Sequence, residues 1–309
     1  MTANLSKGPL MSLKRFLASA AAALSLGTAA CATVDTPPAG AVPGPALWRV
    51  ADADTTIYLF GTFHALDGKA DWFNDEVREA FDASQDVVLE VLTPDNPADL
   101  GPVVMKYAVD TSGKTLTSKL SPDGQKALAA ALAHYGMPAN ALDGFKPFFA
   151  SLTLTMLQFK ELGMGTEQGS EAVLKKAAAE SAKKLGAVET VEDQLAMFSS
   201  LSDEEQVRLL EASLKEGDKM AGEIRNMLAM WNRGDAAAVA KLIQQRDTDS
   251  PPLYKARFTD RDARWVKWIG DRLQRPGTVF MAVGTGHLAG DRSVVGLLEQ
   301  QGLKVTRVQ

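Results

Sequence analysis

Two of the three histidines in this sequence stand in the same local setting. His64 closes the motif Gly61-Thr-Phe-His64, and His287 closes Gly284-Thr-Gly-His287, each directly after a hydrophobic, strand-like run. A single Gly-x-x-His sequence is common by chance. Its repetition at two strand exits predicts that both imidazoles face one cleft, because open α/β sheets bind ligands at the ends of their strands. The alternative is that both rings only cap strand ends, and His134, in an Ala-rich segment, is expected on the surface.

Glu90 is the third candidate, because it is the one charged residue inside the apolar run Val87 to Leu92. A carboxylate in a strand buried on both faces is costly unless it has a partner or reaches a cleft. A metal ion bound by His64 and His287 is one such partner, and an arginine at a strand end is the alternative.

Two histidines and a glutamate are the ligand chemistry of a catalytic zinc or similar divalent site, with one position left for water. Water bound there becomes acidic enough to attack a carbonyl near neutral pH. Without a metal, the same trio can serve as general base and acid. A shared ion requires the two imidazoles to lie within about 8 Å of each other before any relaxation.

Weaker candidates surround this trio. Glu189 ends a short strand-like run, and Arg257 and Arg261 can bind a substrate carboxylate through paired hydrogen bonds. The alternative for both arginines is a solvated helix face. Glu167 lies within a glycine-rich break, Gly163 to Gly169, and Glu171 is expected only to complement the start of a helix.

Composition and missing motifs narrow the function. The chain has 309 residues, 46% of them hydrophobic, and a net charge of -5, so nucleic acid is not an expected partner. The sequence has no His-Glu-x-x-His, no Gly-x-Ser-x-Gly, no P-loop and no Gly-x-Gly-x-x-Gly. With the single cysteine, Cys31, at the end of the predicted export signal, no cysteine nucleophile remains either. These absences argue against zincins, α/β-hydrolases, kinases and thiol proteases.

Residues 1–31 are typical of an export signal. Two basic residues precede the run Phe16 to Leu26, which is apolar or small throughout and too short to cross a bilayer as a helix. Small residues follow. Residues 32–46 are rich in Pro and Ala and predict an extended tether, so the folded domain is expected to cover 47–309.

Cys31 is the only cysteine, so it cannot form an internal disulfide. Its position at the end of the signal matches the lipidated cysteine of bacterial lipoproteins, although Thr28 stands where a Leu-like residue is usual. The prediction is an exported protein with two alternatives. It is either an outer-membrane lipoprotein attached through Cys31 or a soluble periplasmic protein.

The strand-like runs lie at the two ends of the mature chain, and the middle is predominantly helical. This order predicts an α/β (α+β) fold with a mixed central β-sheet formed by N- and C-terminal strands. The runs that end at Phe60 and Val283 are expected to be close neighbours in that sheet. The expected strands are Leu47–Val50, Thr55–Phe60, Asp86–Leu92, Ala187–Thr190, Thr278–Val283 and Lys304–Val308.

With both Gly-x-x-His motifs in place, the chain resembles the TraB/GumN family from Leu47 to Val308. The likeness includes the segments Tyr58–His64, Val87–Glu90, Val188–Leu195 and Leu303–Val308. The family is related to the Tiki ectodomains, which act as metal-dependent proteases, and more distantly to erythromycin esterase and ChaN-like folds. The resemblance implies that His64, Glu90 and His287 form the active site.

The sequence departs from the family where members often carry Arg-Asn, because Arg261 is followed by Asp262 here. This leaves the role of Arg261 open. The expected function is a metal-dependent hydrolase of the bacterial cell envelope, a peptidase or amide hydrolase that uses Zn, Mn or Co on a peptide or small-molecule substrate. The alternative is a binding protein that sequesters such a ligand in the same cleft without turnover.

Overall fold

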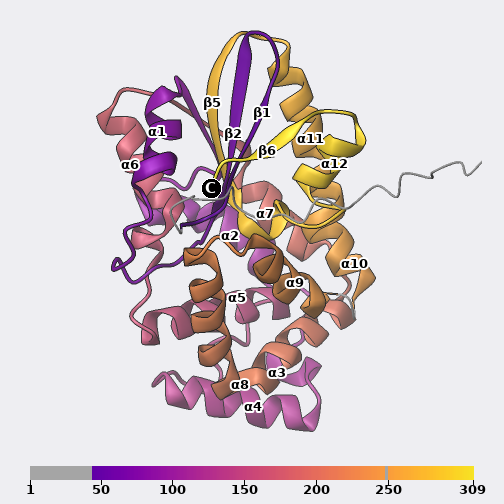
Figure 1. The fold of residues 1–309 in the computed structure, drawn as a ribbon. Helices are drawn as coiled ribbons and strands as arrows, with labels where there is room; N and C mark the ends of the chain where they lie inside the picture. Colours follow the sequence, from indigo (N-terminus) through magenta and orange to yellow (C-terminus); the bar gives the residue numbers. More distant parts are fainter. Residues whose placement is uncertain (1–43, 248–249) are drawn as a thin grey trace, which may run out of the picture. The chain divides into compact units, whose positions relative to one another are not determined.

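A computed structural model describes residues 44–247 and 250–309 (Figure 1). The predicted export signal and most of the predicted tether lie outside the described residues. The last tether residues, Pro45 and Ala46, are buried, and the carbonyl of Ala46 accepts a hydrogen bond from the Gly61 N–H at 3.0 Å. A shortened chain that preserves these contacts therefore has to begin at or before Pro45. Within the described residues, no helix combines the length and apolarity needed to cross a membrane.

A six-stranded mixed sheet forms the centre of the domain, in the order β4-β3-β5-β2-β1-β6. Strands β4, β3, β5 and β2 are parallel, whereas β1 is antiparallel to both β2 and β6. The first and last strands of the chain share this sheet, so the predicted fold class is confirmed. The strands are β1 (Leu47–Ala51), β2 (Thr55–Thr62), β3 (Asp86–Val91), β4 (Lys184–Glu189), β5 (Gly277–Gly284) and β6 (Val305–Arg307).

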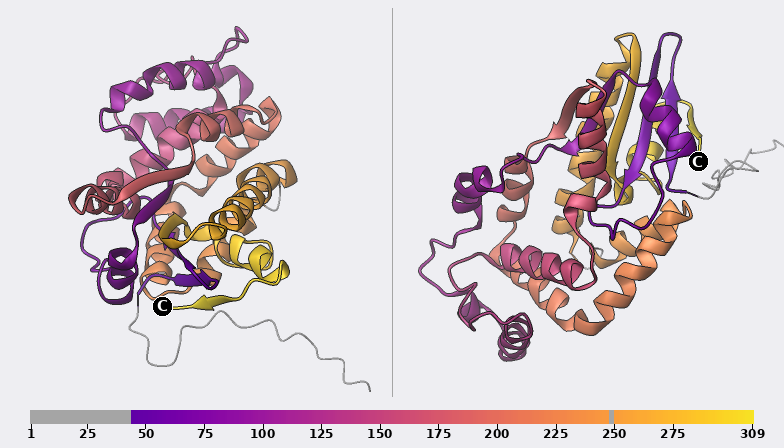
Figure 2. Two further views of the ribbon diagram at one scale, coloured as in Figure 1. Left: turned by 90° about the horizontal axis from the view of Figure 1, so that it is seen from above. Right: turned by 90° about the vertical axis from the view of Figure 1, so that its left-hand side faces the viewer.

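Helices cover both faces of the sheet (Figure 2). In β5, Phe280 and Ala282 pack on one side, whereas Val279, Met281 and Val283 pack on the other. This is why the parallel strands read as continuous apolar runs. One face is covered by α1 (Asp75–Ala83), α6 (Ser170–Glu180) and the second half of α8 (Asp203–Asn232), and the other by α9 (Ala236–Asp247), α11 (Asp260–Leu273) and α12 (Val294–Gln300).

Further helices lie below the sheet in Figure 1 and have apolar clusters of their own. They are α2 (Gly101–Ala108), α3 (Leu116–Lys119), α4 (Pro122–His134), α5 (Pro147–Glu161), α7 (Val191–Ser199) and the first half of α8. Helix α8 reaches from this region to the sheet and changes direction at Gly217, whose φ of 32° favours glycine. Shorter turns are η1 (Pro97–Leu100), η2 (Thr166–Gln168), α10 (Pro251–Tyr254), the π-helical η3 (Lys255–Thr259) and η4 (Thr285–His287).

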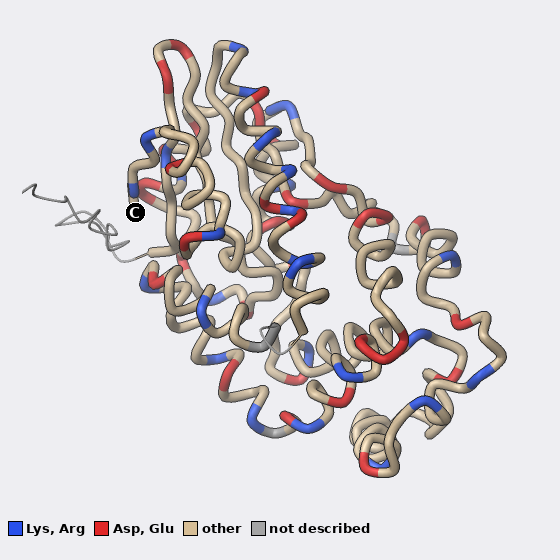
Figure 3. The backbone as a smooth tube through the Cα atoms, turned by 90° about the vertical axis from the view of Figure 1, so that its right-hand side faces the viewer, with Lys and Arg blue, Asp and Glu red and all other residues tan. Residues whose placement is uncertain are grey.

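Positions of Lys and Arg alternate with positions of Asp and Glu along the described chain (Figure 3). The buried ion pairs include that of Lys119 and Asp110, in which Nζ of Lys119 lies 2.5 Å from Oδ2 of Asp110. Burial raises the pKa of Asp110, but hydrogen bonds from Lys119 and Ser112 outweigh burial and lower this pKa to about 2. The folded protein therefore holds this carboxylate ionised more firmly than the unfolded chain does.

We expect Asp110→Asn to change how stability depends on pH. Because the pKa of Asp110 falls on folding, its ionised form stabilises the protein above the unfolded value of 3.8, and this contribution is lost as pH falls toward about 2. Urea unfolding at several pH values should show that Asp110→Asn lowers the free energy of unfolding by a constant amount above pH 4 and by less below pH 4. A difference from wild type that stays constant down to pH 2 would contradict the lowered pKa of Asp110.

Candidate functional site

The carboxyl ends of the four parallel strands bring the candidate residues to one edge of the sheet. His64 follows β2, Glu90 is the second-last residue of β3, Glu189 ends β4, and His287 lies in η4 directly after β5. Thr62 pairs in register with Gly284, so the exits of β2 and β5 are adjacent, as the sequence predicted. The edge is where open α/β sheets bind ligands.

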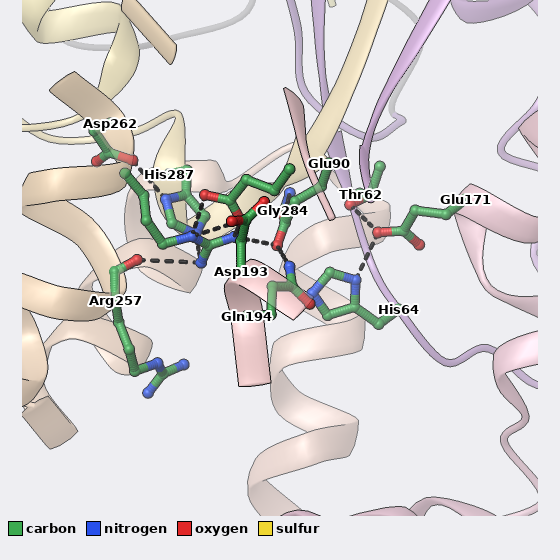
Figure 4. Close-up of polar contacts among 12 residues, drawn as sticks. Thr62, His64, Glu90, Glu171, Asp193, Gln194, Arg257, Asp262, Gly284 and His287 are labelled. Carbon is green, nitrogen blue, oxygen red and sulfur yellow. Dashed lines mark hydrogen bonds and ion pairs between the residues drawn. The ribbon is translucent and has the colours of Figure 1, made fainter. Parts of the chain in front are cut away.

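The side chains of the three principal candidates converge in front of Gly284 (Figure 4). A Cβ atom built there would lie 3.3 Å from Oε2 of Glu90, 3.5 Å from Nε2 of His64 and 3.6 Å from Cδ2 of His287. The two imidazoles are therefore no further apart than the sum of the last two distances, which is below the 8 Å expected of a shared site. Any side chain at Gly284 would occupy the point on which the three groups converge.

His64 is held by a carboxylate that the sequence placed only at a helix start. Nδ1 of His64 lies 2.6 Å from Oε1 of Glu171, in the first turn of α6, and the Thr62 hydroxyl donates to the same oxygen at 2.6 Å. The charge of Glu171 raises the pKa of His64 to about 9. The side chain of His64 is 61% exposed, so this imidazole is open to solvent.

His287 is held in the same way but is buried. Its Nδ1 lies 2.6 Å from Oδ1 of Asp262, and its ring packs against Trp265 and Phe258 at centroid distances of 4.5 and 4.9 Å. Its Nε2 lies 3.1 Å from Nη1 of Arg261. Both histidines therefore have Nδ1 paired with a carboxylate, so any further contact of either ring is made through Nε2, and in His287 this atom is already in contact with Arg261.

Glu90 is paired with an arginine, one of the two alternatives that the sequence left open. Its Oε1 accepts hydrogen bonds from Nη2 of Arg261 at 2.5 Å and Nε2 of Gln194 at 2.9 Å, whereas its Oε2 accepts from the Gly284 N–H at 2.9 Å. Burial raises the pKa of Glu90, but the charges of Arg261 and the two histidines outweigh it and hold the pKa well below its usual range. Glu90 is therefore an ionised carboxylate. Its Oε1 is paired with Arg261, and its Oε2 faces the point in front of Gly284 on which the three side chains converge.

Arg261 is buried, so the solvated-face alternative is wrong for this residue. Its Nε donates to both oxygens of Glu189 at 2.9 and 3.0 Å, and its Nη2 donates to Oε2 of Glu189 at 2.7 Å. Arg264 reaches the same carboxylate at 3.1 Å. Arg261, which was predicted to bind a substrate carboxylate, is therefore already paired with Glu189, and Glu189, the weaker carboxylate candidate, serves as its partner.

Arg257 contributes its backbone rather than its guanidinium to this arrangement. Its carbonyl accepts from Nη1 of Arg261 at 3.2 Å, and its side chain points away from His287 and Glu90 in Figure 4. Arg257 lies in the π-helical turn η3 directly before α11, and π-helical turns are often found at functional sites. The guanidinium of Arg257 therefore does not line the convergence point.

Sequence reasoning missed Asp262 and Gln194 and gave Glu171 a lesser role. Glu171 is 107 positions from His64, and Gln194 is 104 from Glu90, so no local pattern links either pair. Asp262 stands beside Arg261 where the family often has Asn, and this was the one available signal. The exposed Glu167 remains outside the group of contacting residues.

The donor types fit a divalent ion, although the described residues contain no group of three or more His, Cys, Asp or Glu arranged closely enough to hold one. Nε2 of His64 and Oε2 of Glu90 already face one point. A carboxylate on Nδ1 is the usual way in which a metal-binding histidine is oriented, and both histidines have one. For Nε2 of His287 to join them, Arg261 has to withdraw from that atom, since the two now lie in contact.

The chain is an α/β protein in which two Gly-x-x-His motifs meet at the carboxyl ends of the parallel strands. The sequence model of the TraB/PrgY/gumN family matches residues 46–307, and the chain belongs to this family. The chain is 28% identical over 148 residues to the uncharacterized protein YbaP of Escherichia coli (strain K12), which covers 48% of this chain and 54% of YbaP. YbaP of Shigella flexneri matches to the same extent.

A second kind of relative carries a functional name. The chain is 25% identical over 313 aligned residues to a protein named metalloprotease TIKI homolog, from Amphimedon queenslandica, which covers 85% of this chain and 61% of that protein. The matches thus span less than two thirds of the length of these curated relatives. No solved structure matches the chain.

Proposed function

We propose that this chain is a metal-dependent hydrolase that cleaves peptide or amide bonds at the site formed by His64, Glu90 and His287. The observation that carries the proposal is the convergence of these three side chains in front of Gly284. Membership of the TraB/PrgY/gumN family and the distant relative named a metalloprotease support it.

The residues have distinct roles in this proposal. His64 and His287 would hold a divalent ion (Zn, Mn or Co) through Nε2, and such an ion makes water acidic and polarises a carbonyl. Glu90 would use Oε2 either as a further ligand or to accept a proton from the attacking water. Arg261 positions Glu90 through its other oxygen, and Glu171 and Asp262 orient the two imidazoles.

Metal analysis and a peptide-library assay test this function together. The purified protein should contain a divalent ion and cleave a subset of a mixed peptide library. A chelator should abolish cleavage, and the added ion should restore it. Cleavage that persists in chelator after the protein has been shown to be metal-free would contradict the metal-dependent mechanism.

One observation favours the rival function, a binding protein that sequesters its ligand. Arg261 contacts both Oε1 of Glu90 and Nε2 of His287, so a guanidinium now occupies part of the coordination space. If this arrangement is permanent, the chain would bind peptides without turnover. Ligand capture by metal-free protein, with no product after prolonged incubation with added ions, would support the rival.

We also propose that the protein is exported and attached to a membrane through lipidated Cys31, on the sequence features of residues 1–31. Cys31→Ser should then move the protein from the membrane to the soluble periplasmic fraction. Immunoblots of the two fractions provide the measurement, with total expression as the control. An unchanged distribution would leave the soluble periplasmic alternative.

A further inference from the structure

A cavity of about 580 Å³ lies between α5 and the turn that leads into η2. We propose that this cavity is a specificity subsite that receives a large apolar side chain, such as Leu, Met or Phe, of an extended peptide. The proposal rests on the proposed function, because it identifies the substrate class of the same site. The volume is within the range of about 300–1,000 Å³ that is usual for ligand pockets.

The walls of the cavity are apolar. They are formed mainly by the side chains of Phe149, Leu152, Met156, Leu157 and Met164. Met156 is 44% exposed, and among the described residues the one other exposed large apolar side chain is Met105, at 62%. A methionine suits a binding surface because its flexible thioether adapts to different partners.

The cavity wall is fixed to the loop that carries His64. Gly165, which lines the cavity, donates a backbone hydrogen bond to the Leu66 carbonyl at 2.8 Å and accepts one from the Leu66 N–H at 3.1 Å. Further along the same segment, Gly169 approaches the His64 carbonyl so closely that a Cβ would lie 2.1 Å from it. A substrate group bound in the cavity would therefore have a defined position relative to His64.

Charge at the rim favours a peptide over a charged ligand. Lys160 and Glu167 line the cavity with opposite charges, and Thr153 and Thr166 add neutral hydrogen-bonding groups. A neutral side chain suits the apolar wall, and the peptide groups on either side of it can use these polar groups. A side chain with a carboxylate would lose part of its hydration against Leu152 and Met156.

A change of charge at Met156 tests the subsite. The probe is a positional-scanning hexapeptide library in which each position carries Leu, Ala or Glu in turn on a neutral background. Wild type should cleave the Leu form at one position about 10–100-fold better than the Ala form, since this is the range for burying a Leu-sized side chain. Met156→Lys should lose that preference and gain one for Glu at the same position.

Met105→Lys is the matched control, because Met105 is also an exposed methionine but lies on α2 and does not line the cavity. It should retain the wild-type preference. Metal content should be unchanged in both variants. Altered selectivity in Met156→Lys alone supports the subsite, whereas identical selectivity in wild type and Met156→Lys overturns it and leaves the hydrolase intact.

A binding measurement separates failure of the subsite from failure of catalysis. Fluorescently labelled Leu and Glu peptides are titrated against wild-type protein and Met156→Lys in chelator, with anisotropy as the readout. Binding that prefers Leu in wild type and Glu in the variant, without cleavage in any condition, supports the subsite and overturns the hydrolase. If no peptide is either bound or cleaved, both the subsite and the hydrolase are overturned.

Discussion

Arg261→Met should destabilise the fold by about 3–5 kcal/mol, because it removes one partner from a buried ion-pair network. The guanidinium lies between Glu90 and Glu189, and all three side chains are buried. Methionine fills much of the same space but leaves two carboxylates without their shared cation. The loss should appear as a lower urea midpoint with little change in the slope of the unfolding transition.

Arg264→Met is the control for this prediction. Arg264 also pairs with Glu189, at 3.1 Å, but its side chain is 59% exposed. Its loss should cost less than about 1 kcal/mol, as is usual for exposed ion pairs. Adding Glu189→Gln to Arg261→Met should recover part of the loss, because one uncompensated charge is removed. Equal effects of the two arginine variants would show that Arg261 does not hold the network together.

Glu90→Gln should lower turnover by about 10²–10⁴-fold if Glu90 accepts a proton from water. In that case the variant should retain the metal. If Glu90 is instead a ligand, metal affinity should fall together with activity. Both oxygens of Glu90 now accept hydrogen bonds, so a glutamine NH₂ has to face a donor on one side. We therefore expect some loss of stability as well, and turnover has to be measured where unfolding curves show the variant to be folded.

Glu171→Gln provides the comparison within the same site. Thr62 and His64 both bond to one oxygen of Glu171, Oε1, so the amide oxygen of glutamine can take its place. Removing its charge should reduce activity or metal affinity by about 10–100-fold, as for other groups that orient a metal-binding histidine. A Glu90→Gln variant that is folded and as active as wild type would place the chemistry elsewhere.

The fold and the convergence of the three principal residues followed from local sequence patterns. Apolar runs at both ends of the domain predicted a shared sheet, and the pairing of β2 with β5 confirms it. Because His64 and His287 each follow such a run, parallel strands were enough to bring them together. Glu90 could be identified because it is a charged residue inside an apolar, strand-like run.

The contacts that hold these residues could not be predicted, because they join distant segments. Arg261 has the spacing of an exposed helix residue, and only the position of Glu189, 72 residues earlier, explains why it is buried. The assignment of Glu171 to His64 depends on where α6 docks against the end of β2. One sequence contains no periodic signal for either pairing.

Calorimetric titration of the metal-free protein with Zn, Mn and Co is the most direct test of a single shared site. Wild type should bind one ion per chain, and His64→Ala and His287→Ala should each abolish that binding. His134→Ala is the matched control, since His134 is exposed, pairs with Glu161 and lies outside the site, so it should bind as wild type does. Ion binding that survives in either His64→Ala or His287→Ala with unchanged affinity would contradict the shared site.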